Sequence, residues 1–245
     1  MEGALGLALP WQTLAQEVTP DGPLELRRRG ERDFLITLDN RVIMTSAAHR
    51  SELALGALAA ESCSTRRSPR LLLGGLGMAF TLRAALDALP PRAHVIVAEL
   101  NPAVLSWCRG PLAPLTDGAV LDPRVSVECA DVASVIADAP SAHFDSIALD
   151  LFSGPRAPRR DDLHYGIDAL RRMRDTLRTG GVLAVWSEQP DPAFAKSLQR
   201  AGFDVSRRRP GRGGLRHAVT LGVRGPDSRD DRRREPAARR RSSGE

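Results

Sequence analysis

A cluster of glycines, Gly74, Gly75 and Gly77, directly follows the apolar stretch "LLL" at residues 71–73. Glycine has no Cβ, so its backbone can approach a ligand closely and can adopt φ angles that other residues avoid. A helical pattern follows the cluster, and the first turn of a helix offers free N–H groups. This order of features predicts a loop that receives a nucleotide-like molecule.

Three acidic residues stand where later strand-like segments end. Glu99 follows "HVIVA" about 20 residues after Gly77, the expected place for a carboxylate that accepts hydrogen bonds from ribose hydroxyls. Asp131 follows "RVSVECA", and Asp150 follows "FDSIAL". Asp131 has a second interpretation, as the N-cap of the helical segment "VASVIADA".

The residues around the glycines restrict the ligand class. A dinucleotide fingerprint requires a third small residue where this chain has Phe80, which disfavours NAD. No lysine followed by serine or threonine comes after the glycines, which excludes a P-loop. An adenosyl group without phosphates, as in S-adenosylmethionine, suits such a loop.

The elements that position these residues alternate between strand-like and helical segments from residue 66 onward. The strand-like segments are continuously apolar, as expected for parallel strands buried on both faces. We predict an α/β fold with a doubly wound, mostly parallel Rossmann-like sheet of the class I methyltransferase type, whose ligands bind at the carboxyl ends of the strands. The segments "FDVSRRR" and "RHAVTLGV" predict a C-terminal antiparallel hairpin.

The pattern of the N-terminal region predicts a small β-meander. The segments "LELRRRG", "DFLITLD" and "RVIMTS" are strand-like, and Asp39-Asn40 is a tight-turn signal. A helix follows, with Ser51 as its predicted cap. We therefore expect an N-terminal β-strand subdomain with a linking helix at residues 1–65, the Rossmann-like domain at residues 66–223, and a disordered Arg-rich tail at residues 224–245.

Composition excludes several classes of function. The chain of 245 residues has a net charge of +5, but much of the basic excess lies near the C-terminus, so nucleic acid is an unlikely partner. Its three cysteines, Cys63, Cys108 and Cys129, form no CxxC pair, which indicates neither a disulfide framework nor a zinc site. The apolar runs are too short to cross a membrane. We expect a soluble, cytoplasmic protein without a metal.

Taken in order along the chain, these segments resemble the spermidine synthase-like (polyamine aminopropyltransferase) family of class I S-adenosylmethionine-dependent transferases. The resemblance is carried by "MTSAAHRSELAL", "GGLGMAFTLRAALDALP", "VAELNPAV", "LDPRVSVECADV", "FDSIALDLFSGP" and "GGVLAVWSEQPDPAF". It implies that the glycine loop holds the methionine-derived part of S-adenosylmethionine or decarboxylated S-adenosylmethionine, Glu99 the ribose, and Asp131 with Val132 the adenine. It also implies that the N-terminal β-domain helps to form a dimer or a tetramer, and we expect a homodimer.

Two departures from the family pattern concern the donor and the acceptor. The family loop "GGGDGG" carries an acid that meets the amine of decarboxylated S-adenosylmethionine, where this chain has Met78. The family segment "DSSDP" carries a second acid that orients or deprotonates the attacking amine, where "DLFSGP" has Ser153. Ser153 is a poor base for an ammonium ion, and Arg156, Arg159 and Arg160 follow it. These residues favour an anionic or neutral acceptor over a polyamine.

Asp150 is the acid that we expect at the reacting centre. Candidate helpers, each with a structural alternative, are His49, Glu52, His164, Tyr165 and Glu188. The main hypothesis is a transferase acting on an unknown small-molecule acceptor, by aminopropyl or by methyl transfer. The alternatives are a non-catalytic protein that binds a nucleoside or a partner, and nucleic-acid binding through the arginine-rich tail.

Overall fold

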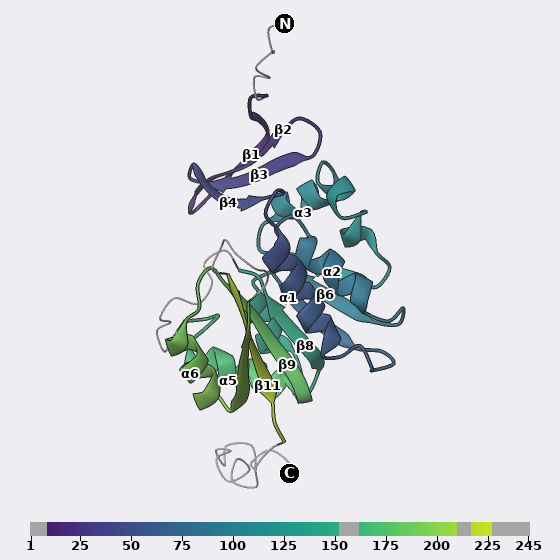
Figure 1. Cartoon of the computed structure of the whole chain (residues 1–245), viewed down its shortest axis with the longest axis vertical. Coiled ribbons are helices and arrows are strands. Elements are labelled where there is room, and N and C mark those ends of the chain that lie inside the picture. The colour runs from purple at the N-terminus through teal and green to yellow at the C-terminus, as the bar shows by residue number, and fades with distance from the viewer. Residues whose placement is uncertain (1–8, 152–161, 210–216, 227–245) are drawn as a thin grey trace, which may run out of the picture.

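The computed structural model describes residues 9–151, 162–209 and 217–226, and within them the chain forms two sheets (Figure 1). The first is an antiparallel meander of four strands, β1 (Gln12–Thr19), β2 (Gly22–Arg29), β3 (Asp33–Leu38) and β4 (Arg41–Thr45). Asp39 and Asn40 turn between β3 and β4 with φ angles of 48° and 59°, as the tight-turn signal predicts. The sequence pattern missed β1 because most of its residues are exposed on both faces.

The second sheet has seven strands in the order β10-β11-β9-β8-β5-β6-β7. Its strands are β5 (Arg70–Gly74), β6 (His94–Ala98), β7 (Val125–Glu128), β8 (Phe144–Leu149), β9 (Leu177–Ser187), β10 (Phe203–Arg208) and β11 (Ala218–Arg224). The strands from β5 to β9 pair in parallel, and β11 is antiparallel to both β9 and β10. The doubly wound α/β fold and the C-terminal hairpin are therefore confirmed.

Helices cover both faces of this sheet. They are α1 (Arg50–Glu61), α2 (Phe80–Ala88), α3 (Pro102–Arg109), α4 (Val132–Asp138), α5 (Ile167–Thr176) and α6 (Pro192–Arg200), with short 3-10 turns at Ala113–Leu115 and Ala119–Leu121. Side chains alternate across a strand, so Leu71 and Leu73 join the core beneath α1, α2 and α3, whereas Leu72 joins the core beneath α4, α5 and α6.

The N-cap of helix α1 lies two residues before the predicted cap, Ser51. His49 is the N-cap residue and makes no capping bond through its side chain, so the assignment of Ser51 as the cap was wrong. Ser51 is a buried residue within the helix. Further along, α1 crosses α2 closely at Gly56, where a Cβ atom would lie 2.2 Å from the carbonyl oxygen of Thr81.

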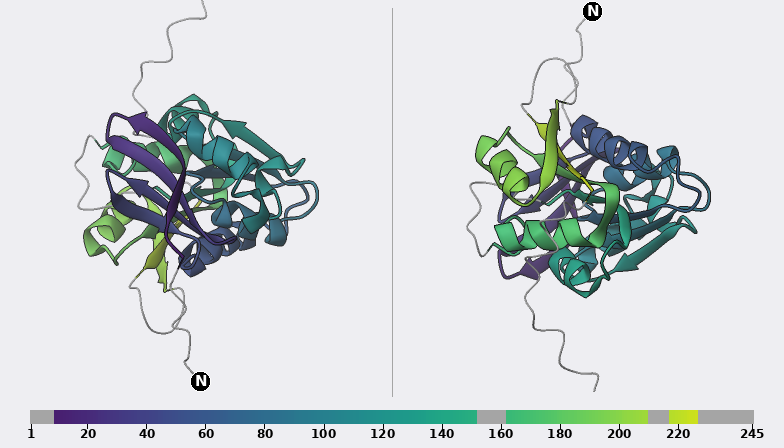
Figure 2. Two further views of the ribbon diagram at one scale, coloured as in Figure 1. Left: turned by 90° about the horizontal axis from the view of Figure 1, so that it is seen from above. Right: turned by 90° about the horizontal axis from the view of Figure 1, so that it is seen from below.

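The meander covers the edge of the seven-stranded sheet at which the parallel strands end, which we call the carboxyl edge. Figure 1 shows the meander above the α/β domain, and Figure 2 shows from above that its strands lie across that domain. Met44 of β4 contacts the glycine loop that follows β5. Leu26 and Ile36 from the meander share a buried core with α1 and α2, which fixes this arrangement.

The last strand of the hairpin lies inside the sheet, between β9 and β10. It includes Arg224, which the charge pattern had placed in the tail. This side chain is buried and donates to the carbonyl oxygens of Arg174, Asp175 and Leu177. The boundary at residue 224 was therefore wrong by at least this residue. The rest of the predicted tail from residue 227 on, and residues 210–216 between the two hairpin strands, lie outside the described residues.

Candidate functional site

The glycine loop lies where β5 and β8 end side by side, the point at which the strand order reverses. The main-chain N–H of Gly75 donates to the carbonyl oxygen of Ala98, and that of Asp150 donates to the carbonyl oxygen of Gly74. Gly75 has a φ angle of +87°, and a Cβ atom there would lie 2.4 Å from the carbonyl oxygen of Asp150. Only glycine fits because the two strand ends approach so closely.

Three side chains from other elements hold the loop. Glu99 accepts hydrogen bonds from the main-chain N–H groups of Leu76, at Oε2 (2.9 Å), and of Asn101, at Oε1 (2.8 Å). The Cys108 thiol donates to the carbonyl oxygen of Gly77 at 3.2 Å. Met44 accepts from the N–H of Met78 through its sulfur at 3.2 Å. Met44 and Cys108 carried no signal in the sequence, because their contacts depend on how β4 and α3 pack.

Glu99 is almost completely buried at the end of β6. Burial raises the pKa of its carboxyl group, and the hydrogen bonds from the backbone at Asn101, Leu76 and Leu100 oppose that rise. A carboxylate oxygen can accept more than one hydrogen bond. Glu99 can therefore hold the loop and still accept hydrogen bonds from a ligand.

Asp150 follows β8 at the centre of the carboxyl edge. Its Oδ2 atom accepts a 2.6 Å hydrogen bond from the hydroxyl of Thr81 on α2. Burial of the carboxyl group raises its pKa to about 7; the Thr81 hydrogen bond lowers it, and the negative charge of Glu52 adds to the rise. A carboxyl group with this pKa is about half ionised at neutral pH, which suits a general base. Thr81 carried no signal in the sequence, since nothing in its local pattern points to Asp150.

Glu52 comes to the site from α1 and is itself buried. Its Oε2 atom accepts a hydrogen bond from Ser51 at 2.7 Å, and the same hydroxyl lies 2.8 Å from Nδ1 of His217, which directly precedes the last strand of the hairpin. Neither Glu52 nor Asp150 has an ion-pair partner among the described residues. Two carboxyl groups therefore lie near each other with no cation between them in this part of the chain.

Asp131 is the N-cap of α4, so the capping interpretation is confirmed. Its Oδ1 atom accepts from the N–H of Ala133 at 2.8 Å and lies 2.8 Å from Nε2 of His164. Its Oδ2 atom makes no hydrogen bond within the described residues. The predicted adenine contact at Asp131 and Val132 stays a prediction that this geometry allows.

The remaining candidates divide into three groups. His164 and Tyr165 belong to the turn before α5. His164 lies within hydrogen-bond distance of Asp131, and Tyr165 is close enough to Asp150 for the charge of that carboxylate to act on it. His49 stacks on Phe80 at 4.1 Å and bonds the carbonyl oxygen of Ser46, so it serves the start of α1. Glu188 is exposed after β9.

Met78, at the position of the missing loop acid, is fully buried in the core. The predictions for Ser153, Arg156, Arg159 and Arg160 lie outside the described residues.

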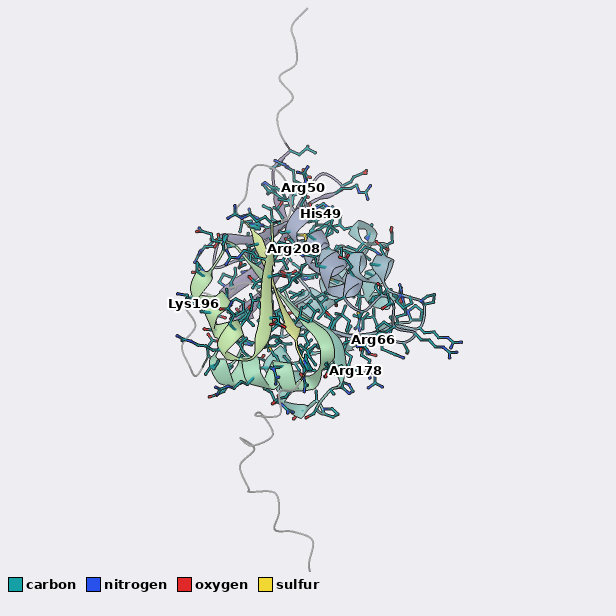
Figure 3. All side chains as sticks on the ribbon, turned by 60° about the horizontal axis from the view of Figure 1, so that its bottom comes forward. His49, Arg50, Arg66, Arg178, Lys196 and Arg208 are labelled. Atoms are coloured by element: carbon teal, nitrogen blue, oxygen red, sulfur yellow. The ribbon has the colours of Figure 1, made fainter. Side chains whose placement is uncertain are left out.

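Basic side chains of the described residues lie at several places on the molecule. Arg208 ends β10 at the carboxyl edge, and Arg50 begins α1. Figure 3 shows Lys196 on one side of the molecule and Arg66 and Arg178 on the other. Arg66 and Arg178 share the buried carboxylate of Asp145, at 3.0 and 2.9 Å. A cavity of about 320 Å³ beside Arg92, His94 and Arg124 lies at the opposite edge of the sheet, where β6 and β7 begin, and so is separate from this site.

Comparison with solved structures finds spermidine synthases. The enzyme from Thermotoga maritima has a TM-score of 0.68 and 19% identity, over 89% of this chain and 75% of that one. A spermidine synthase in complex with the transition-state analogue AdoDATO has a TM-score of 0.66 and 18% identity, over 89% and 74%. A probable spermidine synthase from Corynebacterium glutamicum has a TM-score of 0.60 and 18% identity, over 86% and 79%.

The chain has a spermidine synthase-like fold. This agrees with the resemblance found in the sequence. At 18–19% identity the likeness establishes the fold. No protein-family model and no curated protein sequence matches the chain. Within the described residues of this spermidine synthase-like chain, no helix is both long enough and apolar enough to cross a membrane.

Proposed function

We propose that this protein is a transferase that moves an alkyl group from a sulfonium nucleoside of the S-adenosylmethionine type to an amine. The observation that carries the proposal is the buried carboxyl group of Asp150, which is held by Thr81 beside Glu52 and has a pKa of about 7. Its place at the end of β8 is the place where an open α/β sheet binds its ligand.

The donor set at the carboxyl edge fits an adenosyl group without phosphates. Glu99 at the end of β6 can accept bonds from ribose hydroxyls, and Oδ2 of Asp131 can accept one from the adenine amino group. The glycine loop between them allows close backbone approach. The only lysine of the chain, Lys196, lies on α6 and not in the loop. Met78 offers no carboxylate for a cation at the loop.

When bound, a sulfonium nucleoside supplies an electrophilic carbon next to its positive sulfur. The protein then has to align the acceptor, keep water out and accept a proton. An amine attacks only when its nitrogen lone pair is free, so Asp150 in its ionised form would take the proton from the ammonium group. A base with a pKa of about 7 exists in the required form in about half of the molecules at neutral pH.

Glu52 revises the acceptor class that the sequence favoured. Ser153 in place of an acid, and the arginines that follow it, argued against a cationic acceptor. However, α1 brings a second buried carboxyl group to Asp150 from a distant part of the chain. Burial of a charged amine is unfavourable without an opposite charge, and this pair supplies one. An amine is therefore the acceptor that the described residues suit best.

The test combines binding and turnover. Calorimetric titration with S-adenosylmethionine and, separately, with decarboxylated S-adenosylmethionine identifies the preferred donor. Incubation of that donor with a panel of primary amines, carboxylates and phenols should release S-adenosylhomocysteine for methyl transfer or methylthioadenosine for aminopropyl transfer. Asp150→Asn is the control, and it should bind the nucleoside but lose turnover.

Each outcome decides between the hypotheses. Turnover with amines alone supports the proposal, and the released nucleoside distinguishes aminopropyl from methyl transfer. Turnover with carboxylates or phenols would refute the amine assignment. Binding of the nucleoside without turnover of any acceptor would favour a non-catalytic nucleoside-binding protein.

A further inference from the structure

The hydroxyl group of Tyr165 is a buried polar group that has no hydrogen-bond partner among the described residues. The residue as a whole is only 5% exposed. A hydroxyl that loses its hydrogen bonds to water and gains none in the fold is unfavourable, and such groups in native proteins call for an explanation. A group that awaits a ligand is one such explanation.

The position of Tyr165 is fixed by its neighbours. Its main-chain N–H donates to Oδ1 of Asp162 at 2.8 Å. Its ring packs edge-on against Phe194, with ring centroids 5.6 Å apart and an interplanar angle of 83°. The preceding residue, His164, lies 2.8 Å from Asp131 at the carboxyl edge. Because these contacts hold both the backbone and the ring, the hydroxyl cannot easily swing away to find another partner.

The surroundings of this hydroxyl are negatively charged. Burial has the largest effect in raising the pKa of Tyr165, and the charges of Asp150 and Asp162 raise it further. The hydroxyl therefore stays neutral, and it lies close enough to Asp150 to sense its charge. A positively charged N–H donor is the kind of ligand group that such surroundings attract.

We propose that Tyr165 is a specificity-determining residue whose hydroxyl oxygen accepts a hydrogen bond from an amino group of the molecule bound beside Asp150. This inference rests on the function proposed above. The contact gives up no hydrogen bond to water, since the hydroxyl is already buried. The amino group belongs either to the methionine-derived part of the nucleoside or to the acceptor, and the experiment separates these two sources.

The test variant is Tyr165→Phe, which removes only the oxygen atom. The matched control is Thr37→Val on β3, which removes another buried hydroxyl that has no partner among the described residues, but from the meander. Both variants are titrated calorimetrically with methylthioadenosine, which lacks the propyl chain that carries the amino group, and with S-adenosylmethionine and decarboxylated S-adenosylmethionine, which have it. A further titration uses putrescine in the presence of methylthioadenosine.

We expect Tyr165→Phe to bind methylthioadenosine as the wild type does and to melt at the same or a higher temperature. Its affinity should fall about tenfold for the two amino-bearing nucleosides, if the contact is to the nucleoside, or for putrescine, if it is to the acceptor. Thr37→Val should change none of these affinities. Tyr165 is the only tyrosine of the chain. In the wild type, the tyrosine band of the near-ultraviolet difference spectrum should therefore change on binding of the ligand whose affinity Tyr165→Phe reduces.

Three results would overturn the inference. Wild-type affinities of Tyr165→Phe in every titration would show that the hydroxyl meets no ligand. An equal loss for methylthioadenosine would assign the contact to the nucleoside core and refute the amino-group assignment. A wild-type protein that binds none of the probes would refute the proposed function as well, and this outcome is visible before any variant is made.

Discussion

Replacing Asp150 by asparagine should stabilise the protein relative to the wild type, by an amount that grows as pH rises through the raised pKa of Asp150 and stays constant above it. The folded protein raises the pKa of Asp150 from 3.8 to about 7, chiefly through burial. A carboxyl group with a raised pKa keeps its proton in the folded state at pH values where the unfolded chain has released it. The stability that it contributes is fully present below about pH 3.8 and is lost as pH rises to about 7. Asparagine does not titrate.

The expected magnitude follows from that shift in pKa. Each unit corresponds to about 1.4 kcal/mol, so the whole effect is at most about 4 kcal/mol. The part that develops between about pH 5 and about pH 8.5 is roughly 2–3 kcal/mol. Asp150 keeps some exposed surface, which reduces the effect. We therefore expect the difference in unfolding free energy between variant and wild type to widen by about 2 kcal/mol over this range.

The assay is urea-induced unfolding at several pH values across this range, on the wild type, on Asp150→Asn and on Asp138→Asn. Asp138 is exposed on α4, so its variant controls for the loss of one negative charge. Only Asp150→Asn should gain stability relative to the wild type as pH rises, with an unchanged dependence on urea concentration. A difference that stays constant with pH would refute the argument that Asp150 is buried as a neutral acid.

Three further predictions concern the site. Thr81→Val removes the hydrogen bond that lowers the pKa of Asp150, so the acid limb of the kcat/KM profile should move up by about one pH unit, and an unmoved limb would exclude the bond. Glu99→Gln turns an amide NH₂ toward the N–H of Leu76 or Asn101 and should weaken nucleoside binding at least about tenfold by calorimetry; unchanged affinity would refute the ribose contact. Gly77→Ala places a Cβ 2.7 Å from the sulfur of Met44, at a φ angle of +52°, and should lower the melting temperature and weaken binding together; an unaffected variant would show that the loop yields easily.

The doubly wound sheet could be predicted from the sequence because its signals are local. Continuous apolar strands such as that at residues 71–73, the glycines that follow, and the acids Glu99, Asp131 and Asp150 at strand ends are all visible in short windows. Parallel strands bring their carboxyl ends to one edge, so local spacing alone places these residues together. The hairpin was predicted on the same local grounds.

Errors arose where a local signal competed with packing. Ser51 looks like a cap, but α1 begins at Arg50 and buries Ser51 against Glu52 and His217. Strand β1 was missed because its mostly exposed residues show little alternation; its backbone is ordered by pairing with β2. Arg224 looks like part of a charged tail, yet its guanidinium group satisfies carbonyl oxygens near the start of β9.

The sequence by itself determined the sheet, the glycine loop and the identity of the acids, because strand periodicity and turn chemistry act over a few residues. Only the tertiary structure decided what surrounds Asp150. Thr81 and Glu52 reach it from two helices that cross at Gly56, and Tyr165 comes near it from the turn before α5. Such contacts join residues far apart in the chain, and they exist only once the helices are packed on the sheet.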